Sequence, residues 1–204
     1  MAPKKPQPRK PVPGNLAPKH PQLRIIGGEW RSRQVQFPNL AAVRPTPDRV
    51  RETLFNWLRT HIHGARCLEP FAGSGALSLE SLSRGASFCY ALDLLPETLT
   101  ALNVNLKTLG AAEARYRCER ADARSWLRDY TGEPFDLIFL DPPFADKDTK
   151  ELLALAMTPA LLAKEGLVYV ETDAALEIVQ LPERSAITRQ KKAGTVHYAL
   201  VARQ

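Results

Sequence analysis

The sequence predicts an α/β fold with a mainly parallel sheet covered by helices on both faces. From residue 46 onward, short apolar runs alternate with segments whose apolar residues recur at helical spacing. Glycines or acids follow the first four apolar runs, where the chain would leave a strand for a helix. Strands that alternate with helices imply right-handed crossovers, which make neighbouring strands parallel.

The first regular element is expected to be a helix that begins near residue 46. Thr46 suits the N-cap position, Pro47 the first helical position and Asp48 the first turn. Apolar residues then recur at helical spacing as far as Ile62. We therefore expect a helix over residues 46–62, ahead of the first strand.

Strands and helices should alternate through the remainder of the chain. We expect strands over residues 65–71, 87–93, 114–120, 135–141 and 166–172. Helices should follow the glycine-rich turn at 72–75 and occupy 96–110, 121–130 and 147–166, the last with a break near Pro159. The tail ends in another apolar run, 196–202, and the chain contains no visible internal repeat.

Charge is distributed unevenly along the chain. Residues 1–24 contain six basic residues, no acid and seven of the 17 prolines, so they account for the whole net charge of +6. A segment this polar and rich in proline cannot bury enough surface to fold alone. We expect a disordered arm over 1–22, either a solubilising tail or a segment that contacts phosphates, then an RNA-contacting segment over 23–45 and a catalytic domain over 46–204.

The stretch RIIGGEWRSR, residues 24–33, interleaves arginines with a tryptophan around a Gly-Gly turn. Such a pattern suits a nucleic-acid surface. The arginines that precede the first glycine loop form the predicted RNA-binding set: Arg24, Arg31, Arg33, Arg44, Arg49 and Arg51.

Several classes of protein and site are disfavoured by the composition. No apolar stretch is long enough to span a membrane, and the charged start lacks the apolar run of a signal peptide, so we expect a cytoplasmic protein without a membrane partner. Cys67, Cys89 and Cys118 lie far apart without histidines at metal-ligand spacing. We interpret them as buried free thiols and expect no metal.

The informative residues should lie at the carboxyl ends of the strands, where ligands bind in open parallel sheets. Glu69, Gly73 and Gly75 follow the first strand, and the glycines allow a ligand to approach backbone amides at a helix N-terminus. Asp93 follows Gly73 by twenty residues, the spacing at which an acid accepts hydrogen bonds from a ribose. Asp122, after the third strand, could contact an adenine amine. Both aspartates have a structural alternative as helix N-caps.

Two other functions compete for these features. GSGALS, residues 73–78, nearly fits the nicotinamide dinucleotide fingerprint G-x-G-x-x-G. However, Ser78 replaces the third glycine, Glu69 precedes the loop where it could meet a cationic amine, and no tyrosine and lysine suited to hydride transfer follow. A non-catalytic RNA-binding module is the second alternative, and it leaves residues 141–144 unexplained.

The fourth strand ends in DPPF, residues 141–144. Pro142 and Pro143 hold the backbone after Asp141 extended and stiff. The Asp141 carboxylate and the proline carbonyls are then acceptors beside the ring of Phe144, which suits the exocyclic amine of a flipped base. Orienting that amine toward a sulfonium methyl allows an in-line displacement without a metal.

These motifs resemble those of the S-adenosylmethionine-dependent class I amino methyltransferases. More narrowly, residues 24–33, 44–58, 71–86 and 141–144 resemble the RsmD family, bacterial enzymes that methylate N2 of a guanine in 16S ribosomal RNA. The resemblance implies a Rossmann-like fold with a mainly parallel seven-stranded sheet, and S-adenosylmethionine as cofactor. It implies a catalytic set, Asp141, Pro142, Pro143 and Phe144, and a cofactor-binding set, Thr46, Glu69, Phe71, Gly73, Gly75, Asp93, Asp122 and Ala123. Ser32 departs from the family, which usually has glycine there.

The identity of the target base rests on this resemblance. The chemistry of DPPF would equally serve the amine of an adenine or a cytosine, or a glutamine amide. The expected partner is 16S ribosomal RNA or an assembling small subunit, and we expect the protein to act as a monomer.

Overall fold

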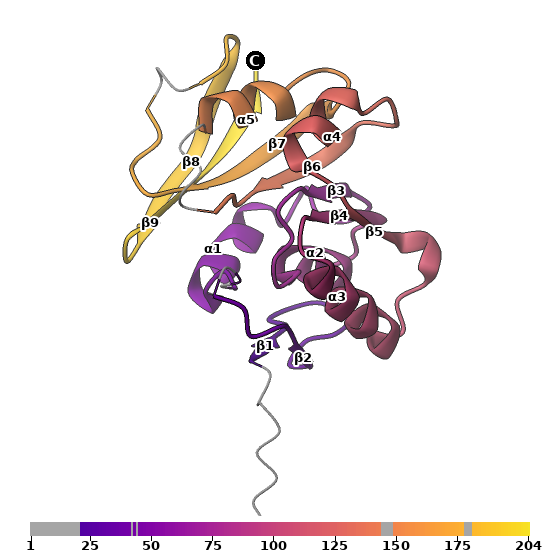
Figure 1. Cartoon of the computed structure of the whole chain (residues 1–204). Helices are drawn as coiled ribbons and strands as arrows, with labels where there is room; N and C mark the ends of the chain where they lie inside the picture. Colours follow the sequence, from indigo (N-terminus) through magenta and orange to yellow (C-terminus); the bar gives the residue numbers. More distant parts are fainter. Residues whose placement is uncertain (1–20, 42, 44, 144–148, 178–180) are drawn as a thin grey trace, which may run out of the picture.

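The computed structural model describes residues 21–41, 43, 45–143, 149–177 and 181–204. Its centre is a seven-stranded sheet with the strand order β5-β4-β3-β6-β7-β9-β8 (Figure 1). The first five strands in this order are parallel, whereas β9 pairs antiparallel with both β7 and β8. The strands are β3 (Arg66–Glu69), β4 (Phe88–Asp93), β5 (Tyr116–Arg120), β6 (Phe135–Leu140), β7 (Leu162–Thr172), β8 (Ser185–Ala193) and β9 (Val196–Arg203). The predicted mainly parallel seven-stranded sheet is confirmed.

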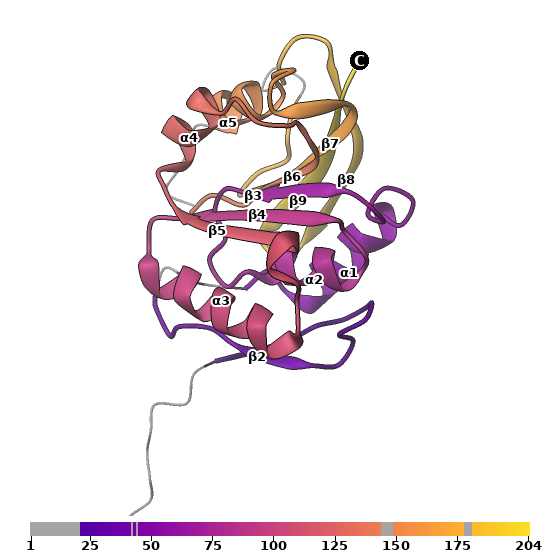
Figure 2. The ribbon, with the colours of Figure 1, turned by 90° about the vertical axis from the view of Figure 1, so that its right-hand side faces the viewer.

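Helices cover both faces of the sheet, as Figures 1 and 2 show. One face carries α1 (Asp48–Trp57), α2 (Ala76–Ser83) and α3 (Pro96–Leu109), and the other carries α4 (Ala123–Asp129) and α5 (Thr149–Ala156). A short 3-10 helix, Glu113–Arg115, precedes β5. This layering is the predicted doubly covered sheet.

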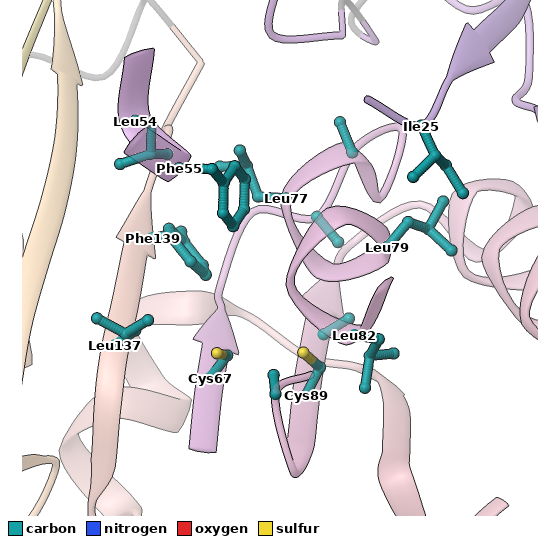
Figure 3. Close-up of a cluster of buried hydrophobic side chains, with 14 of the residues drawn as sticks. Ile25, Leu54, Phe55, Cys67, Leu77, Leu79, Leu82, Cys89, Leu137 and Phe139 are labelled. Atoms are coloured by element: carbon teal, nitrogen blue, oxygen red, sulfur yellow. The ribbon is translucent and has the colours of Figure 1, made fainter. Parts of the chain in front are cut away.

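Alternation along β6 supplies both halves of the core. Leu137 and Phe139 join the cluster under α1 and α2, whereas Ile138 and Leu140 join the cluster under α4 and α5. Successive side chains of a strand point to opposite faces, so a run that is apolar throughout fits a strand buried on both sides. Figure 3 shows the first cluster, in which Phe55 of α1 lies near Phe139.

A small hairpin, β1 (Gln22–Arg24) and β2 (Gln34–Gln36), packs on the outer side of α2 and α3 (Figure 2). The Asn105 side chain of α3 exchanges two hydrogen bonds with the backbone of Gln36. Within the hairpin loop, Ser32 has a left-handed backbone with φ 67°. That conformation favours glycine, so the serine at this position is strained.

Arg51 and Glu80 form a buried ion pair that joins α1, α2 and the hairpin. Both side chains are fully buried, and Arg51 Nη1 lies 3.4 Å from Glu80 Oε2. The remaining donors of Arg51 reach the carbonyls of Thr46 and Arg24, and the carboxylate of Asp48. The two Glu80 oxygens also accept from two hairpin amides, Ile26 and Gly27, and from Arg84. This network fixes how the hairpin sits on α1 and α2.

Three local expectations were wrong. The helix expected over 46–62 begins at Asp48, because its N-cap Pro47 has an extended ψ of 147°, and it ends at Trp57 instead of Ile62. The predicted helix over 147–166 ends at Ala156 among the described residues, since the chain turns before Pro159 and then enters β7 at Leu162. Strand β8 was not expected, because its residues are mostly exposed and lack alternation.

The buried ion pair generates a prediction about stability. Arg51→Ala leaves Glu80 as a buried charge with fewer partners, so the free energy of unfolding should fall by about 3–5 kcal/mol. Urea denaturation measures the loss. The control is Arg128→Ala, which breaks an exposed pair with Glu151 and should cost less than about 1 kcal/mol. Equal losses for the two variants would contradict a structural role for Arg51.

Candidate active site

Five neighbouring strands carry an acid at the same edge of the sheet. Because β5, β4, β3, β6 and β7 are parallel neighbours, their carboxyl ends meet along one edge. In that order the acids are Asp122, Asp93, Glu69, Asp141 and Glu171. Four of them were predicted from the sequence, and Glu171 was not. The structure therefore brings together the predicted strand-end residues that it describes.

The glycine loop joins β3 to α2. Gly73 and Gly75 have left-handed backbones, with φ of 49° and 71°. A Cβ at Gly73 would meet open space, whereas one at Gly75 would lie 2.5 Å from the Leu102 side chain. Gly75 is also the N-cap of α2 and supplies no side chain to the helix end. The loop therefore leaves room for a ligand near the start of α2.

Glu69 is buried at the start of α2. Its Oε2 accepts hydrogen bonds from the backbone amide of Ser78 at 3.0 Å and from the Ser78 hydroxyl at 2.5 Å. Ser78 occupies the position of the third glycine in a dinucleotide fingerprint, and here its side chain has a specific partner. Burial raises the pKa of Glu69 to about 7, although the two Ser78 hydrogen bonds oppose the shift.

Asp93 links the two loops that follow β3 and β4. Its Oδ2 accepts from the Gly73 amide at 2.7 Å, and its Oδ1 accepts from the Leu95 amide at 2.9 Å. The N-cap of α3 is Leu95, so the alternative role of Asp93 as that N-cap is wrong. Each carboxylate oxygen has a second lone pair, which leaves Asp93 able to accept from a ligand.

Asp122 is the N-cap of α4. Its side chain accepts from the Ser125 amide at 2.9 Å, and this bond holds the pKa of Asp122 below its usual range. The structural alternative for Asp122 is therefore confirmed. The carboxylate is nevertheless exposed, so it retains acceptor capacity for a ligand. Ala123, which follows it, is the buried first residue of α4, and Phe71 is half-buried beside the cluster under α4 and α5.

Asp141 follows the last residue of β6, with Pro142 buried and Pro143 exposed. The Thr46 hydroxyl donates to Asp141 Oδ2 over 3.5 Å. Burial and the neighbouring carboxyls of Glu171 and Glu69 raise the pKa of Asp141 well above its usual range, whereas the Thr46 hydrogen bond opposes the rise. Thr46 was expected to cap α1, but its side chain donates to Asp141 instead. We call the carboxyl edge of the sheet, with its five acids and the glycine loop, the crevice. Phe144 lies outside the described residues.

The predicted RNA-binding arginines do not form one group. Arg51 is buried in its ion pair, so its guanidinium is not available to a phosphate. Arg49 is exposed in the first turn of α1, three residues after Thr46, and Arg24 at the end of β1 is exposed and pairs with Asp48 of the same turn. The loop that carries Arg31 instead bonds to Ser83 at the end of α2, and Arg33 donates to the Thr108 carbonyl at the end of α3. Arg44 lies outside the described residues.

The stretch 24–33 was expected to contact RNA, but its second half packs against the end of α2, away from the carboxyl edge of the sheet. Helix α2 begins at the crevice, so its last residue, Ser83, lies a helix length away from it. The hairpin loop binds at that far end. Trp30 is also buried, so its ring cannot stack on a base. The local sequence contained no signal for this burial.

The crevice fits a ligand that has hydrogen-bond donors and positive charge. Among the described residues, Glu69, Asp93, Asp141 and Glu171 take part in no ion pair. Buried carboxyls without a cationic partner favour a ligand that supplies one. The ribose hydroxyls, amines and sulfonium of S-adenosylmethionine have this chemistry. Asp93, Glu69 and the glycine loop are placed to hold such a group.

The described part of the chain contains neither a metal-binding cluster nor a membrane-spanning helix. No group of three or more histidine, cysteine, aspartate or glutamate side chains there could hold a metal ion. No helix in the same residues is long and apolar enough to cross a membrane. Cys67 and Cys89 are buried free thiols, as predicted, and Cys118 is half-buried.

The sheet order and the convergent strand ends define a Rossmann-like methyltransferase, the class that uses S-adenosylmethionine as methyl donor. The family model described as conserved hypothetical protein 95 matches residues 23–202. The chain therefore belongs to this family. It is the RsmD family, whose motifs the sequence resembles.

Relatives and solved structures agree with this assignment. The chain is 42% identical to ribosomal RNA small subunit methyltransferase D of Escherichia coli strain K12, with 90% of this chain and 91% of the relative covered. It is 37% identical to the Haemophilus influenzae protein of the same name, with 88% and 93% covered. A solved Escherichia coli structure, 41% identical, matches with a TM-score of 0.80 and coverages of 90% and 99%.

The raised pKa of Glu69 predicts a pH-dependent stability. The folded protein holds a proton on this carboxyl up to about pH 7, above the ordinary value of 4.5. The stabilisation is therefore complete below pH 4.5 and is lost as the pH rises to about 7. Glu69→Gln removes this titration, so its stability relative to wild type should rise by about 3 kcal/mol across that window.

Urea denaturation of both proteins at several pH values across this window measures the difference. Glu165→Gln is the control, because Glu165 is exposed on β7 and its replacement should give a flat difference. A flat difference for Glu69→Gln as well would show that burial does not control this carboxyl.

Proposed function

We propose that this protein transfers a methyl group from S-adenosylmethionine to the exocyclic N2 amine of a guanine in 16S ribosomal RNA. The observation that carries the proposal is the Asp141–Pro142–Pro143 strand end, which lies beside buried carboxyls and the glycine loop. The names of the relatives support small-subunit ribosomal RNA as the substrate, and the choice of guanine as the base follows from the sequence resemblance.

In this proposal, one group of residues in the crevice binds the cofactor and another binds the base. Asp93 accepts hydrogen bonds from the ribose, Asp122 from the adenine amine, and Glu69 with the glycine loop holds the methionine part. The bound cofactor supplies a methyl group carried on a sulfonium. Thr46, Phe71 and Ala123 complete the walls of this part of the site.

Asp141 acts on the base. Its carboxylate accepts a hydrogen bond from the guanine amine, which fixes the direction of the nitrogen lone pair. The two prolines keep the strand end from rotating away. Phe144 supplies the stacking surface in this proposal. Orientation of this kind needs no metal, because the leaving group is already activated by its positive charge.

RNA reaches the crevice past the start of α1. Arg24 and Arg49 are exposed arginines beside the first turn of α1, whereas Arg31 and Arg33 lie at the far ends of α2 and α3. We propose that Arg49 and Arg24 contact phosphates beside the flipped base. The basic arm, residues 1–22, adds looser phosphate contacts in this proposal.

The function is tested by mass spectrometry of ribosomal RNA nucleosides from a strain that lacks this protein. An N2-methylguanosine of the small subunit should disappear and return with the wild-type gene. Asp141→Ala should not restore it, although calorimetry should show that its affinity for S-adenosylmethionine stays within a few-fold of wild type. A nucleoside profile unchanged by the deletion would overturn the proposed substrate.

The RNA path is tested by the salt dependence of RNA binding. Arg49→Ala should lower the slope of log affinity against log salt by about one, because one phosphate contact is lost. Arg31→Ala is the matched control, an equally exposed arginine at the far end of α2, and should leave the slope unchanged. If Arg31→Ala lowers the slope and Arg49→Ala does not, RNA lies along the hairpin instead.

A further inference from the structure

Glu171 is a buried acid beside Asp141 that has no role in the proposed function so far. It lies on β7, and Leu140 of β6 pairs with Val170 of β7 in the parallel register. The next residues along the two strands, Asp141 and Glu171, are therefore neighbours at the carboxyl edge of the sheet. Glu171 is 6% exposed.

The contacts of Glu171 hold its carboxyl toward the crevice. The hydroxyl of Tyr169, two residues earlier on the same face of β7, donates to Glu171 Oε1 at 2.7 Å. The Thr46 hydroxyl donates to Asp141 Oδ2 and lies close enough to Glu171 to oppose the rise in its pKa. A core strand has no structural need for this arrangement.

Glu171 is buried and Asp141 is half-buried, so the two neighbouring carboxyls cannot both be ionised without cost. Neither takes part in an ion pair with a described residue. Burial raises the pKa of Glu171, and burial followed by the Glu171 charge raises the pKa of Asp141. Carboxyl groups that interact in this way lose their protons in steps that belong to the pair.

The groups that face the pair come from β3, β7, β9 and the segment before α1. Tyr169 lies on the same strand, and Tyr198 on β9 is the register partner of Glu171. Glu69 at the end of β3 adds a further negative charge, and Thr46 before α1 adds a neutral hydroxyl. No described cation faces the pair, so a proton is the available positive charge.

We propose that Glu171 is a positioning residue that acts through Asp141: the two carboxyl groups share one proton, and the pair takes up the proton that the target amine loses. This inference rests on the proposed function and adds a destination for that proton. It also explains why the strand next to the catalytic loop ends in a buried acid.

The proposed step conserves atoms and electrons. The lone pair of the amine nitrogen forms the new bond to the methyl carbon as the carbon–sulfur bond breaks, and the electrons of that bond remain on sulfur. The nitrogen then carries a positive charge, and its N–H bond breaks with the electron pair returning to nitrogen. The proton passes to the ionised carboxyl of the pair and later leaves to water.

The test compares the pH dependence of kcat/KM for wild type and Glu171→Gln, with small-subunit RNA and S-adenosylmethionine as substrates. Glutamine keeps an acceptor for the Tyr169 hydroxyl but removes the charge. Without that charge the pKa of Asp141 falls, so the acidic limb of the profile should move to lower pH by about one unit. Glu171→Asp keeps a carboxyl and should keep the limb near its wild-type position.

Glu119→Gln is the matched control, because Glu119 also accepts a hydrogen bond from a tyrosine hydroxyl, that of Tyr90, at the outer strand β5. The acidic limb of the Glu119→Gln profile should stay at its wild-type position. A purely structural role for Glu171 would lower the rate and leave the limb in place, which would overturn the inference.

A second measurement needs no activity. Carbon-13 NMR of protein labelled at the aspartate carboxyl, with the signal assigned by Asp141→Asn, follows Asp141 in the ligand-free protein. Its titration should move to lower pH in Glu171→Gln, and an unmoved titration overturns the coupling. Wild-type protein that methylates no guanine would overturn the proposed function instead, and the titration would still decide whether the two carboxyls share a proton.

Discussion

The buried Arg51–Glu80 pair is the interaction on which the arrangement of the molecule depends. It joins α1 to α2, and through Glu80 it also binds the hairpin backbone at Ile26 and Gly27. Arg51 holds the Thr46 carbonyl, and the Thr46 hydroxyl reaches Asp141. A structural ion pair therefore helps to position Thr46, the hydrogen-bond partner of Asp141. Burying two charges is costly unless their other donors and acceptors are also satisfied, and here several further hydrogen bonds do so.

The parallel sheet has a corresponding electrostatic consequence. Parallel strands place all their carboxyl ends on one edge, so an acid at each of five strand ends forms a row of carboxyl groups. Glu69 and Asp141 respond with raised pKa values, because burial and their acidic neighbours oppose ionisation. Such an edge is matched to a ligand that brings cationic and donor groups. The parallel sheet therefore accounts both for the row of acids and for the cationic ligand that we propose to bind there.

Much of the fold could be predicted because its signals are local. The alternation of apolar runs with helical segments identified β3 to β7 and the helices between them, and the glycines marked the loop before α2. Strand β8 escaped detection, since an exposed edge strand such as Ser185–Ala193 has no buried face to impose alternation. The end of α5 and the start of β7 were misplaced, because Leu161 and Leu162 suit a helix or a strand equally well by composition.

The sequence by itself determined which residues stand at the ends of the strands, because a strand, a turn and a helix each leave a short-range pattern. It therefore indicated Glu69, Asp93, Asp122 and Asp141. Only the tertiary structure decided that Glu171 adjoins Asp141, that Arg51 and Trp30 are buried, and that Arg31 lies far from the crevice. These facts depend on which strands become neighbours and on which helix face the hairpin covers. Contacts between residues far apart in the chain arise from packing, which local spacing does not encode.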